Sequence, residues 1–295
     1  MHEAIQVMLS KYKPRSEQDY INALKEIFQE IALLGLWRAK FYEKAAFYGG
    51  SALRILYGLN RFSEDLDFTL LKPMKDFSLS SYNQAIKDEL NGFGFQVEVK
   101  TKAKNVITNI ESAFLKTDSK TQLIEIEAPE NILSRLHHMH TIKIKMEIDT
   151  NPPGLFSTEV KTLLQPIPFF VKSLTQPDLF AGKVHAILCR PWQKRVKGRD
   201  WYDLVWYISR GTSINLNHLR ERLVQSNAWQ KNENFTPDDL AAMLEEKINN
   251  TDFNNGKKDI APFIHDQDAI ELWSKQFFIS LVRDWVATIQ WDKLG

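Results

Sequence analysis

The sequence predicts an α+β protein in which an N-terminal lobe with a mixed β-sheet is followed by a helical C-terminal lobe. Residues 17–46 repeat apolar positions at helical spacing, whereas Thr141–Asp149 alternates between apolar and polar residues, as a half-buried strand does. After about residue 170 the apolar spacing becomes helical again. We therefore expect residues 1–170 to form the N-terminal lobe and residues 171–295 the C-terminal lobe.

The N-terminal lobe is expected to begin with helices and continue with strands. One or two amphipathic helices are predicted within residues 17–46, and a short helix over Ala52–Tyr57, which Gly58 can end as a C-terminal cap. Residues 79–92 form a third helical pattern. The strands are expected at Asp65–Leu71, Phe95–Thr101, Val106–Phe114, Gln122–Ala128 and Thr141–Asp149.

The C-terminal lobe is predicted to be a set of helices. Thr175 to Asp178 resembles an N-terminal capping box, with Pro177 in the first turn, and the helix continues to Leu188. A second helix, rich in aromatic residues, is expected over Arg199–Ser209. Further helices are expected within Asn217–Val224, Pro237–Asn249 and Gln267–Ile289.

The composition narrows the functional classes. An apolar fraction of 43% and a charged fraction of 25% are ordinary for a globular protein, and no apolar run approaches the roughly 20 residues of a membrane span. The first residues do not resemble a signal peptide. The single cysteine, Cys189, cannot form an internal disulfide and fits a reducing compartment. We therefore expect a cytoplasmic protein with no membrane partner.

The most informative motif combines a glycine turn with two closely spaced aspartates. Gly49, Gly50 and Ser51 precede a short helix, and a helix N-terminus offers backbone N–H groups to an anion such as phosphate. Asp65 and Asp67 follow in an apolar run, where i and i+2 side chains share one face of a strand and can share a hard cation such as Mg²⁺. A lone pair of this kind is usually a solvated strand edge, but the upstream turn favours nucleoside triphosphate chemistry.

These residues resemble a known family. The segments GGSALR and RFSEDLDF are similar to motif I of the DNA polymerase β-type nucleotidyltransferases, and most similar to the AbiEii/AbiGii-type nucleotidyltransferase toxins. The resemblance covers about residues 45–210 and implies a nucleotidyltransferase fold for the N-terminal lobe. It implies that the turn, Gly49 to Ser51, binds the triphosphate and that Asp65 and Asp67 hold metal. Arg61 and Ser63 lie in the matching stretch, so they are expected to position phosphates.

A third carboxylate is expected from the strand Thr141–Asp149. Members of the superfamily commonly use such a residue as a metal ligand or as a base, and the resemblance makes Glu147 the first choice and Asp149 the second. The alternative from the residues alone is a solvent-facing strand surface, where Lys143 and Lys145 pair with these carboxylates and contribute little to stability.

Two further residues are expected to act from the C-terminal lobe. The segments around Lys183 and around Asp200 and Asp203 resemble later motifs of the AbiEii-type proteins, in which the matching lysine and first aspartate are needed for activity. Lys183 would contact the triphosphate as a point charge, and Asp200 would orient Lys183 or the basic loop. Asp200 also suits the N-terminus of a helix on electrostatic grounds alone.

A basic segment and a histidine cluster complete the candidates. Arg190–Arg199 contains five basic residues and is the expected binding site for an RNA acceptor, although a solvated loop would have the same composition. His137 to His140 invites a metal interpretation, but only His138 and His140 would share a strand face, so a surface turn is preferred. His185 lies on a different helix face from Lys183 and receives no role.

The sequence thus predicts a nucleotidyltransferase that uses Mg²⁺ (or Mn²⁺) to transfer NMP from an NTP to an acceptor. The resemblance implies a toxin of a toxin–antitoxin or abortive-infection system, an RNA acceptor such as the 3′ end of a tRNA, and a cognate antitoxin. Two alternatives remain at this point: transfer to a protein or a small molecule, and a non-catalytic module that binds nucleotide or RNA.

Overall fold

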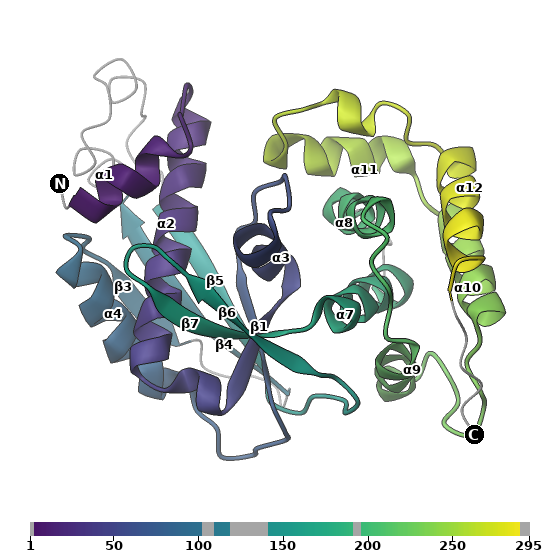
Figure 1. The fold of residues 1–295 in the computed structure, drawn as a ribbon, viewed down its shortest axis with the longest axis horizontal. Coiled ribbons are helices and arrows are strands. Elements are labelled where there is room, and N and C mark those ends of the chain that lie inside the picture. The colour runs from purple at the N-terminus through teal and green to yellow at the C-terminus, as the bar shows by residue number, and fades with distance from the viewer. Residues whose placement is uncertain (1–2, 102–108, 119–140, 191–195, 290–295) are drawn as a thin grey trace. The chain divides into compact units, whose positions relative to one another are not determined.

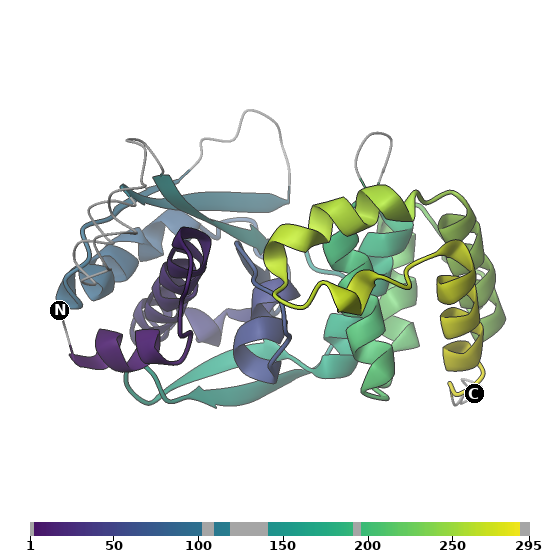
Figure 2. The same cartoon turned by 90° about the horizontal axis from the view of Figure 1, so that it is seen from above.

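The computed structural model describes residues 3–101, 109–118, 141–190 and 196–289 (Figure 1; Figure 2). The chain divides into two compact units. The N-terminal unit comprises Met1–Gly58, Phe62–Pro152 and Thr158–Ser173, and the C-terminal unit comprises Leu59–Arg61, Pro153–Ser157 and Leu174–Gly295. The main division falls between Ser173 and Leu174, and two short segments before it pack with the C-terminal unit.

The N-terminal unit is built on a mixed seven-stranded sheet with the order β3-β4-β5-β2-β1-β7-β6. Strand β2 pairs antiparallel with β1 and parallel with β5, which confirms the predicted α+β class with a mixed sheet. The strands are β1 Ala45–Tyr48, β2 Leu66–Leu70, β3 Glu98–Thr101, β4 Ile110–Asp118, β5 Thr141–Asp149, β6 Thr158–Leu163 and β7 Phe169–Leu174.

The strand register places three chemically important positions side by side. Asp67 on β2 is the direct neighbour of Glu147 on β5 and of Tyr48 at the end of β1. Directly paired residues lie on the same face of a sheet, with neighbouring strands about 4.8 Å apart. Tyr48, at the end of β1 where the chain turns into the next helix, therefore lies one strand away from Asp67 and two strands away from Glu147.

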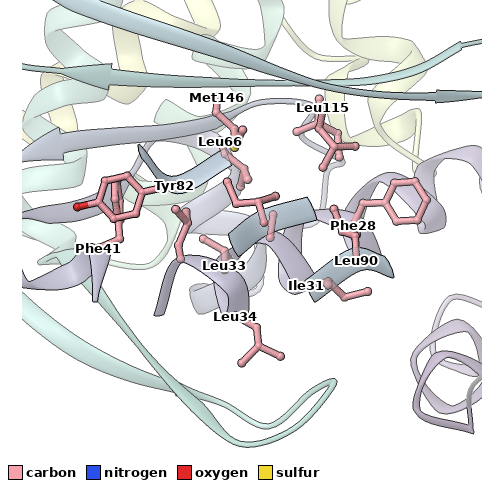
Figure 3. Close-up of a cluster of buried hydrophobic side chains, with 14 of the residues drawn as sticks. Phe28, Ile31, Leu33, Leu34, Phe41, Leu66, Tyr82, Leu90, Leu115 and Met146 are labelled. Carbon is pink, nitrogen blue, oxygen red and sulfur yellow. The ribbon is translucent and has the colours of Figure 1, made fainter. Parts of the chain in front are cut away.

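The helices of this unit cover the sheet through an apolar core. Figure 3 shows Leu66, Leu115 and Met146 of three strands together with Phe28 and Leu33 of α2, all of them buried. Burial of each such side chain stabilises the fold by roughly 1.5–3 kcal/mol. The helices are α1 Glu3–Ser10, α2 Glu17–Arg38, α3 Gly49–Tyr57 and α4 Asn83–Gly92, with 3₁₀ turns at Phe41–Glu43 and Leu79–Tyr82.

Single residues explain where α2 begins, how closely it packs against α4 and where α3 ends. Ser16 caps α2 in a capping box with Asp19, whose carboxylate accepts the Ser16 backbone N–H. Gly35 lets α2 approach α4, because an added Cβ would lie 3.0 Å from the Ala85 carbonyl oxygen. Gly58 ends α3 with φ +75, as expected for a glycine C-terminal cap.

Several element boundaries differ from the sequence prediction. The strand expected at Phe95–Thr101 begins only at Glu98, and the strand expected at Val106–Phe114 is displaced to Ile110–Asp118. Strands β1, β6 and β7 were not predicted, because strands of four to six residues with few alternations give a weak periodic signal. The expected strand Gln122–Ala128 lies outside the described residues.

From α7 onwards, the regular elements in the described part of the C-terminal unit are helices, as predicted (Figure 1; Figure 2). Helices α8 and α11 approach closely at two glycines, since a Cβ on Gly198 would overlap the carbonyl oxygen of Gly256. The helices are α7 Gln176–Cys189, α8 Gly198–Ser209, α9 Leu216–Gln225, α10 Pro237–Asn249, α11 Phe253–Ile260 and α12 Lys275–Val286, with 3₁₀ turns at Ala261–Phe263 and Asp268–Ile270.

The start of α7 corrects one local prediction. Thr175 is the N-cap residue and Pro177 lies in the first turn, but the hydroxyl of Thr175 donates to the Asp178 carboxylate and does not cap the helix. Asp178 also accepts the backbone N–H of Ser157, so it joins α7 to the segment Pro153–Ser157. Within the described residues, no helix is long and apolar enough to cross a membrane.

Candidate nucleotidyltransferase site

The glycine turn contacts the second aspartate directly. Gly49 has φ +81, a conformation that side chains disfavour, and it is the first residue of α3. A Cβ at this position would overlap Oδ2 of Asp67 and lie 3.0 Å from its Cβ and Cγ. Only glycine therefore lets the carboxylate of Asp67 lie against the turn.

Ser51 ties the same turn to the strand. Its side chain is fully buried, and its hydroxyl donates a hydrogen bond to the backbone carbonyl of Asp65. The hydrogen bond of Ser51 and the close contact at Gly49 thus join the start of α3 to the segment that carries Asp65 and Asp67. A helix N-terminus beside two carboxylates can present N–H donors to an anion and oxygen ligands to a cation.

Glu147 lies beside Asp67 on the neighbouring strand and already has two partners. Lys145 Nζ is 2.6 Å from Glu147 Oε1, and the Ser112 hydroxyl donates to the same oxygen at 3.3 Å. Asp149 is the register partner of Thr69, two residues beyond Asp67 on β2, and its carboxylate accepts the Asn151 N–H at 2.9 Å. The register therefore favours Glu147 over Asp149 as the third carboxylate near Asp67.

The donor set fits a hard divalent cation that is shared with a substrate. In the described part of the chain, no three histidine, cysteine, aspartate or glutamate side chains are close enough together to hold a metal by themselves. Mg²⁺ commonly takes only one or two protein carboxylates and completes its shell with water and phosphate oxygens. Asp65 and Asp67, both half-buried, suit that mode of binding, and Glu147 as a third ligand stays a prediction.

Arg61 and Ser63, expected to position phosphates, make other contacts. Arg61 belongs to the C-terminal unit and is 3% exposed, with Nε and Nη2 each 2.6 Å from the Asp203 carboxylate. The backbone carbonyl of Ser63 accepts a hydrogen bond from the Gln29 side chain at 3.1 Å. The Arg61–Asp203 pair spans 142 residues of sequence, and no sequence pattern identifies it.

In the C-terminal unit, Lys183 lies between two buried carboxylates. Its Nζ is 2.7 Å from Asp200 Oδ1 and 2.8 Å from Asp203 Oδ2, and the side chain is 11% exposed. Asp200 also forms an ion pair with Arg190. Asp200 therefore contacts both the lysine and the basic segment, and Asp203, three residues further on α8, contacts the lysine as well. The i, i+3 spacing of the two aspartates explains how they reach one ammonium group.

The pKa of Asp200 reflects these contacts. Burial by itself would raise the pKa of this carboxyl, but Lys183 and Arg190 outweigh burial and lower the pKa from 3.8 to about 2. The pKa of Lys197 is lowered, first by burial and then by the positive charge of Arg190 nearby. Positive side chains are thus crowded around the N-terminus of α8.

The remaining candidates lie partly outside the described residues. Within the basic segment, Arg190 is exposed and the guanidinium of Arg199 lies 4.3 Å from the centre of the Phe263 ring, whereas residues 191–195 are outside the described part. The cluster His137 to His140 is also outside it. His185 contacts Ser226 at 3.0 Å, and burial lowers its pKa to about 4, so it is neutral at pH 7.

The chain is similar to a family model and to solved structures. The sequence model of a family described as "Nucleotidyl transferase AbiEii toxin, Type IV TA system" matches residues 31–279. Among solved structures, the chain is similar to MenT4, a nucleotidyltransferase toxin from Mycobacterium tuberculosis H37Rv, with a TM-score of 0.56 and 14% identity over 97% of this chain and 99% of that chain.

A second solved structure, JHP933 from Helicobacter pylori, is similar with a TM-score of 0.50 and 16% identity over 91% of this chain and 93% of that chain. At these identities the likeness shows the fold. A search of curated proteins found no match.

Proposed function

The chain belongs to the AbiEii family of nucleotidyltransferase toxins, and we propose that it transfers NMP from an NTP to the 3′ end of an RNA, with tRNA as the acceptor. The observation that carries this proposal is the contact between the Gly49 turn and the Asp67 carboxylate, which joins a phosphate-binding helix N-terminus to a cation-binding residue. Membership of a nucleotidyltransferase family also argues against a module that only binds.

The candidate residues of the N-terminal unit have separate roles in the proposed reaction. The backbone of Gly49, Gly50 and Ser51 binds the triphosphate, and Asp65 and Asp67 hold divalent metal, with Glu147 as a third carboxylate that ligates the metal or accepts the proton of the attacking hydroxyl. Asp65 and Asp67 would hold Mg²⁺, which when bound would supply positive charge against the negative charge that develops on the triphosphate. The acceptor hydroxyl forms a bond to the α-phosphorus as the bond to pyrophosphate breaks.

The C-terminal unit contributes positive charge. Lys183, held by Asp200, is proposed as a point charge for a phosphate group. Arg190, Lys197 and Arg199 are proposed to bind the backbone of the acceptor strand, because clustered basic side chains attract nucleic acid. This cluster favours RNA over a cationic small molecule such as an aminoglycoside. Growth arrest, and a cognate antitoxin that prevents it, follow from the toxin family.

The test is transfer of label by the purified full-length protein. The protein is incubated with Mg²⁺, each labelled NTP in turn, and total RNA, purified tRNA or a protein extract. We expect label on tRNA, and we expect Asp67→Ala to reduce the rate by about 10³-fold, because metal stabilisation of the transition state is worth several kcal/mol. Glu98→Gln is a matched control, since Glu98 is an exposed strand carboxylate that pairs with Lys100.

Three outcomes would change the proposal. Label on protein or on a small molecule would retain the enzyme and replace the acceptor. Full activity in Asp67→Ala would remove this carboxylate from the site. If expression of Asp67→Ala slowed growth as much as expression of the wild-type protein does, toxicity would not depend on transfer.

A further inference from the structure

Arg61 has an unusual place in the chain. Residues 59–61 connect α3 to the segment before β2, both in the N-terminal unit, yet they pack with the C-terminal unit. The guanidinium of Arg61 donates two hydrogen bonds to the Asp203 carboxylate, a bidentate arrangement that is the strongest geometry for an arginine–carboxylate pair. Burial alone would lower the pKa of Arg61, but the Asp203 carboxylate outweighs it and holds the pKa above its usual value. Arg61 is therefore charged, and its chief partner is a carboxylate inside the protein.

The contacts continue from Arg61 to Lys183. Asp203, which is 0% exposed, forms ion pairs with both Arg61 and Lys183. Asp200 in turn forms ion pairs with Lys183 and Arg190. We call these five residues the ion network. It contains three positive and two negative side chains, so it carries one excess positive charge. An excess charge in a largely buried setting favours the binding of a counter-ion.

We propose that Arg61 is a positioning residue that acts through Asp203. Asp203 forms an ion pair with the ammonium of Lys183, and Arg61 neutralises the negative charge of Asp203. The positive charge of Lys183 is therefore not cancelled by Asp203. The network can then hold its lysine firmly and still attract a phosphate group. This inference rests on the proposed function, because it assigns the phosphate either to the NTP or to the acceptor strand. It replaces the expectation that Arg61 itself contacts phosphate.

A purely structural ion pair is the rival explanation. In that case Arg61 and Asp203 would stabilise the C-terminal unit, and their removal would change stability without changing substrate affinity. The two explanations differ in the net charge beside Lys183. Without Arg61 the network has two cations and two carboxylates, so the positive charge beside Lys183 falls by one and its attraction for phosphate weakens. Without both Arg61 and Asp203 the excess positive charge returns, but Lys183 keeps only Asp200 as a partner.

The experiment compares wild type, Arg61→Gln and the double variant Arg61→Gln/Asp203→Asn. KM is measured for the NTP at saturating tRNA and for tRNA at saturating NTP. Arg61→Gln should raise one of these KM values about tenfold, as expected for the loss of one charge near a phosphate. The substrate whose KM rises is the one that carries the phosphate. The double variant should bring this KM back to within about threefold of the wild-type value. It should also lower kcat about tenfold, because Lys183 is less firmly held.

The results separate this inference from the proposed function. Unchanged KM values in a folded Arg61→Gln protein would overturn it, as would a double variant with wild-type KM and wild-type kcat. If Arg61→Gln does not fold, the double variant decides, because it removes the cation and its carboxylate together and leaves neither partner buried alone, and its kcat should still fall. If the wild-type protein transfers no label, the proposed function fails, and the same variants are then compared by equilibrium binding of a fluorescent NTP and of tRNA.

Discussion

The carboxylates of the N-terminal and C-terminal units differ in exposure and in partners. Asp65, Asp67 and Glu147 are half-buried, whereas Asp200 and Asp203 are almost fully buried and each contacts two cations. Carboxylates that exchange water for metal and phosphate must be reached from solvent. Carboxylates that hold a lysine in place benefit from burial, because a low local dielectric strengthens each ion pair.

The same residue type should therefore respond differently to substitution in the two units. Removal of a half-buried carboxylate is expected to affect the reaction more than the fold. Removal of a buried carboxylate leaves its cation unpaired in the interior, which costs stability whether or not the protein is catalysing a reaction. Three measurements test this difference between the two units.

The largest effect is expected from Asp203→Asn. The buried guanidinium of Arg61 would lose its bidentate partner, so the free energy of unfolding should fall by about 3–5 kcal/mol. Asp67→Asn should lower it by less than about 1 kcal/mol, as at other sites of partial exposure. Urea unfolding followed by tryptophan fluorescence measures both. Equal destabilisation by the two substitutions would contradict the comparison.

The next effect concerns the glycine turn. In Gly49→Ala the new methyl group would displace the carboxylate of Asp67, so the transfer rate should fall about 100-fold, the size of loss expected when a reacting group shifts by about 1 Å. Gly58→Ala is the matched control, because Gly58 also has positive φ but an added Cβ there meets nothing within 4 Å.

Both alanine variants should lose about 1–2 kcal/mol of stability from backbone strain, and only Gly49→Ala should lose activity. The transfer assay and thermal unfolding are run on the same preparations. Comparable loss of activity in both variants would show that strain, and not the contact with Asp67, makes Gly49 necessary.

The smallest effect is a dependence of stability on acid. The folded-state pKa of Asp200, about 2, lies below its ordinary value of 3.8, because Lys183 and Arg190 outweigh burial. The ionised carboxylate therefore contributes about 2 kcal/mol of stability above pH 4, and this contribution is lost as the pH falls towards 2. The difference in unfolding free energy between wild type and Asp200→Asn should shrink over that interval.

Glu245→Gln is a control for the acid series, since Glu245 pairs with Arg283 on the surface and should change the acid response little. A constant difference between wild type and Asp200→Asn from pH 5 to pH 2 would mean that the carboxylate of Asp200 is not stabilised by its two cations.

Short-range patterns predicted much of the fold. The alternation of Thr141–Asp149 matches β5 residue for residue, and the helical unit beyond residue 170 was expected from its periodicity. Strands β1 and β7 were missed, because the pairing partners that stabilise short strands are distant in sequence. The predicted family was confirmed by the match over residues 31–279.

The sequence by itself determined which residue types are available: a glycine turn, closely spaced aspartates and a lysine in a recognisable order. Only the tertiary structure decided their partners. Strand register selected Glu147 over Asp149 as the neighbour of Asp67. Packing within the C-terminal unit pairs the buried guanidinium of Arg61 with the Asp203 carboxylate. Spacing in the chain specifies which side chains share a local face, whereas contacts between residues far apart in the sequence depend on how whole elements pack.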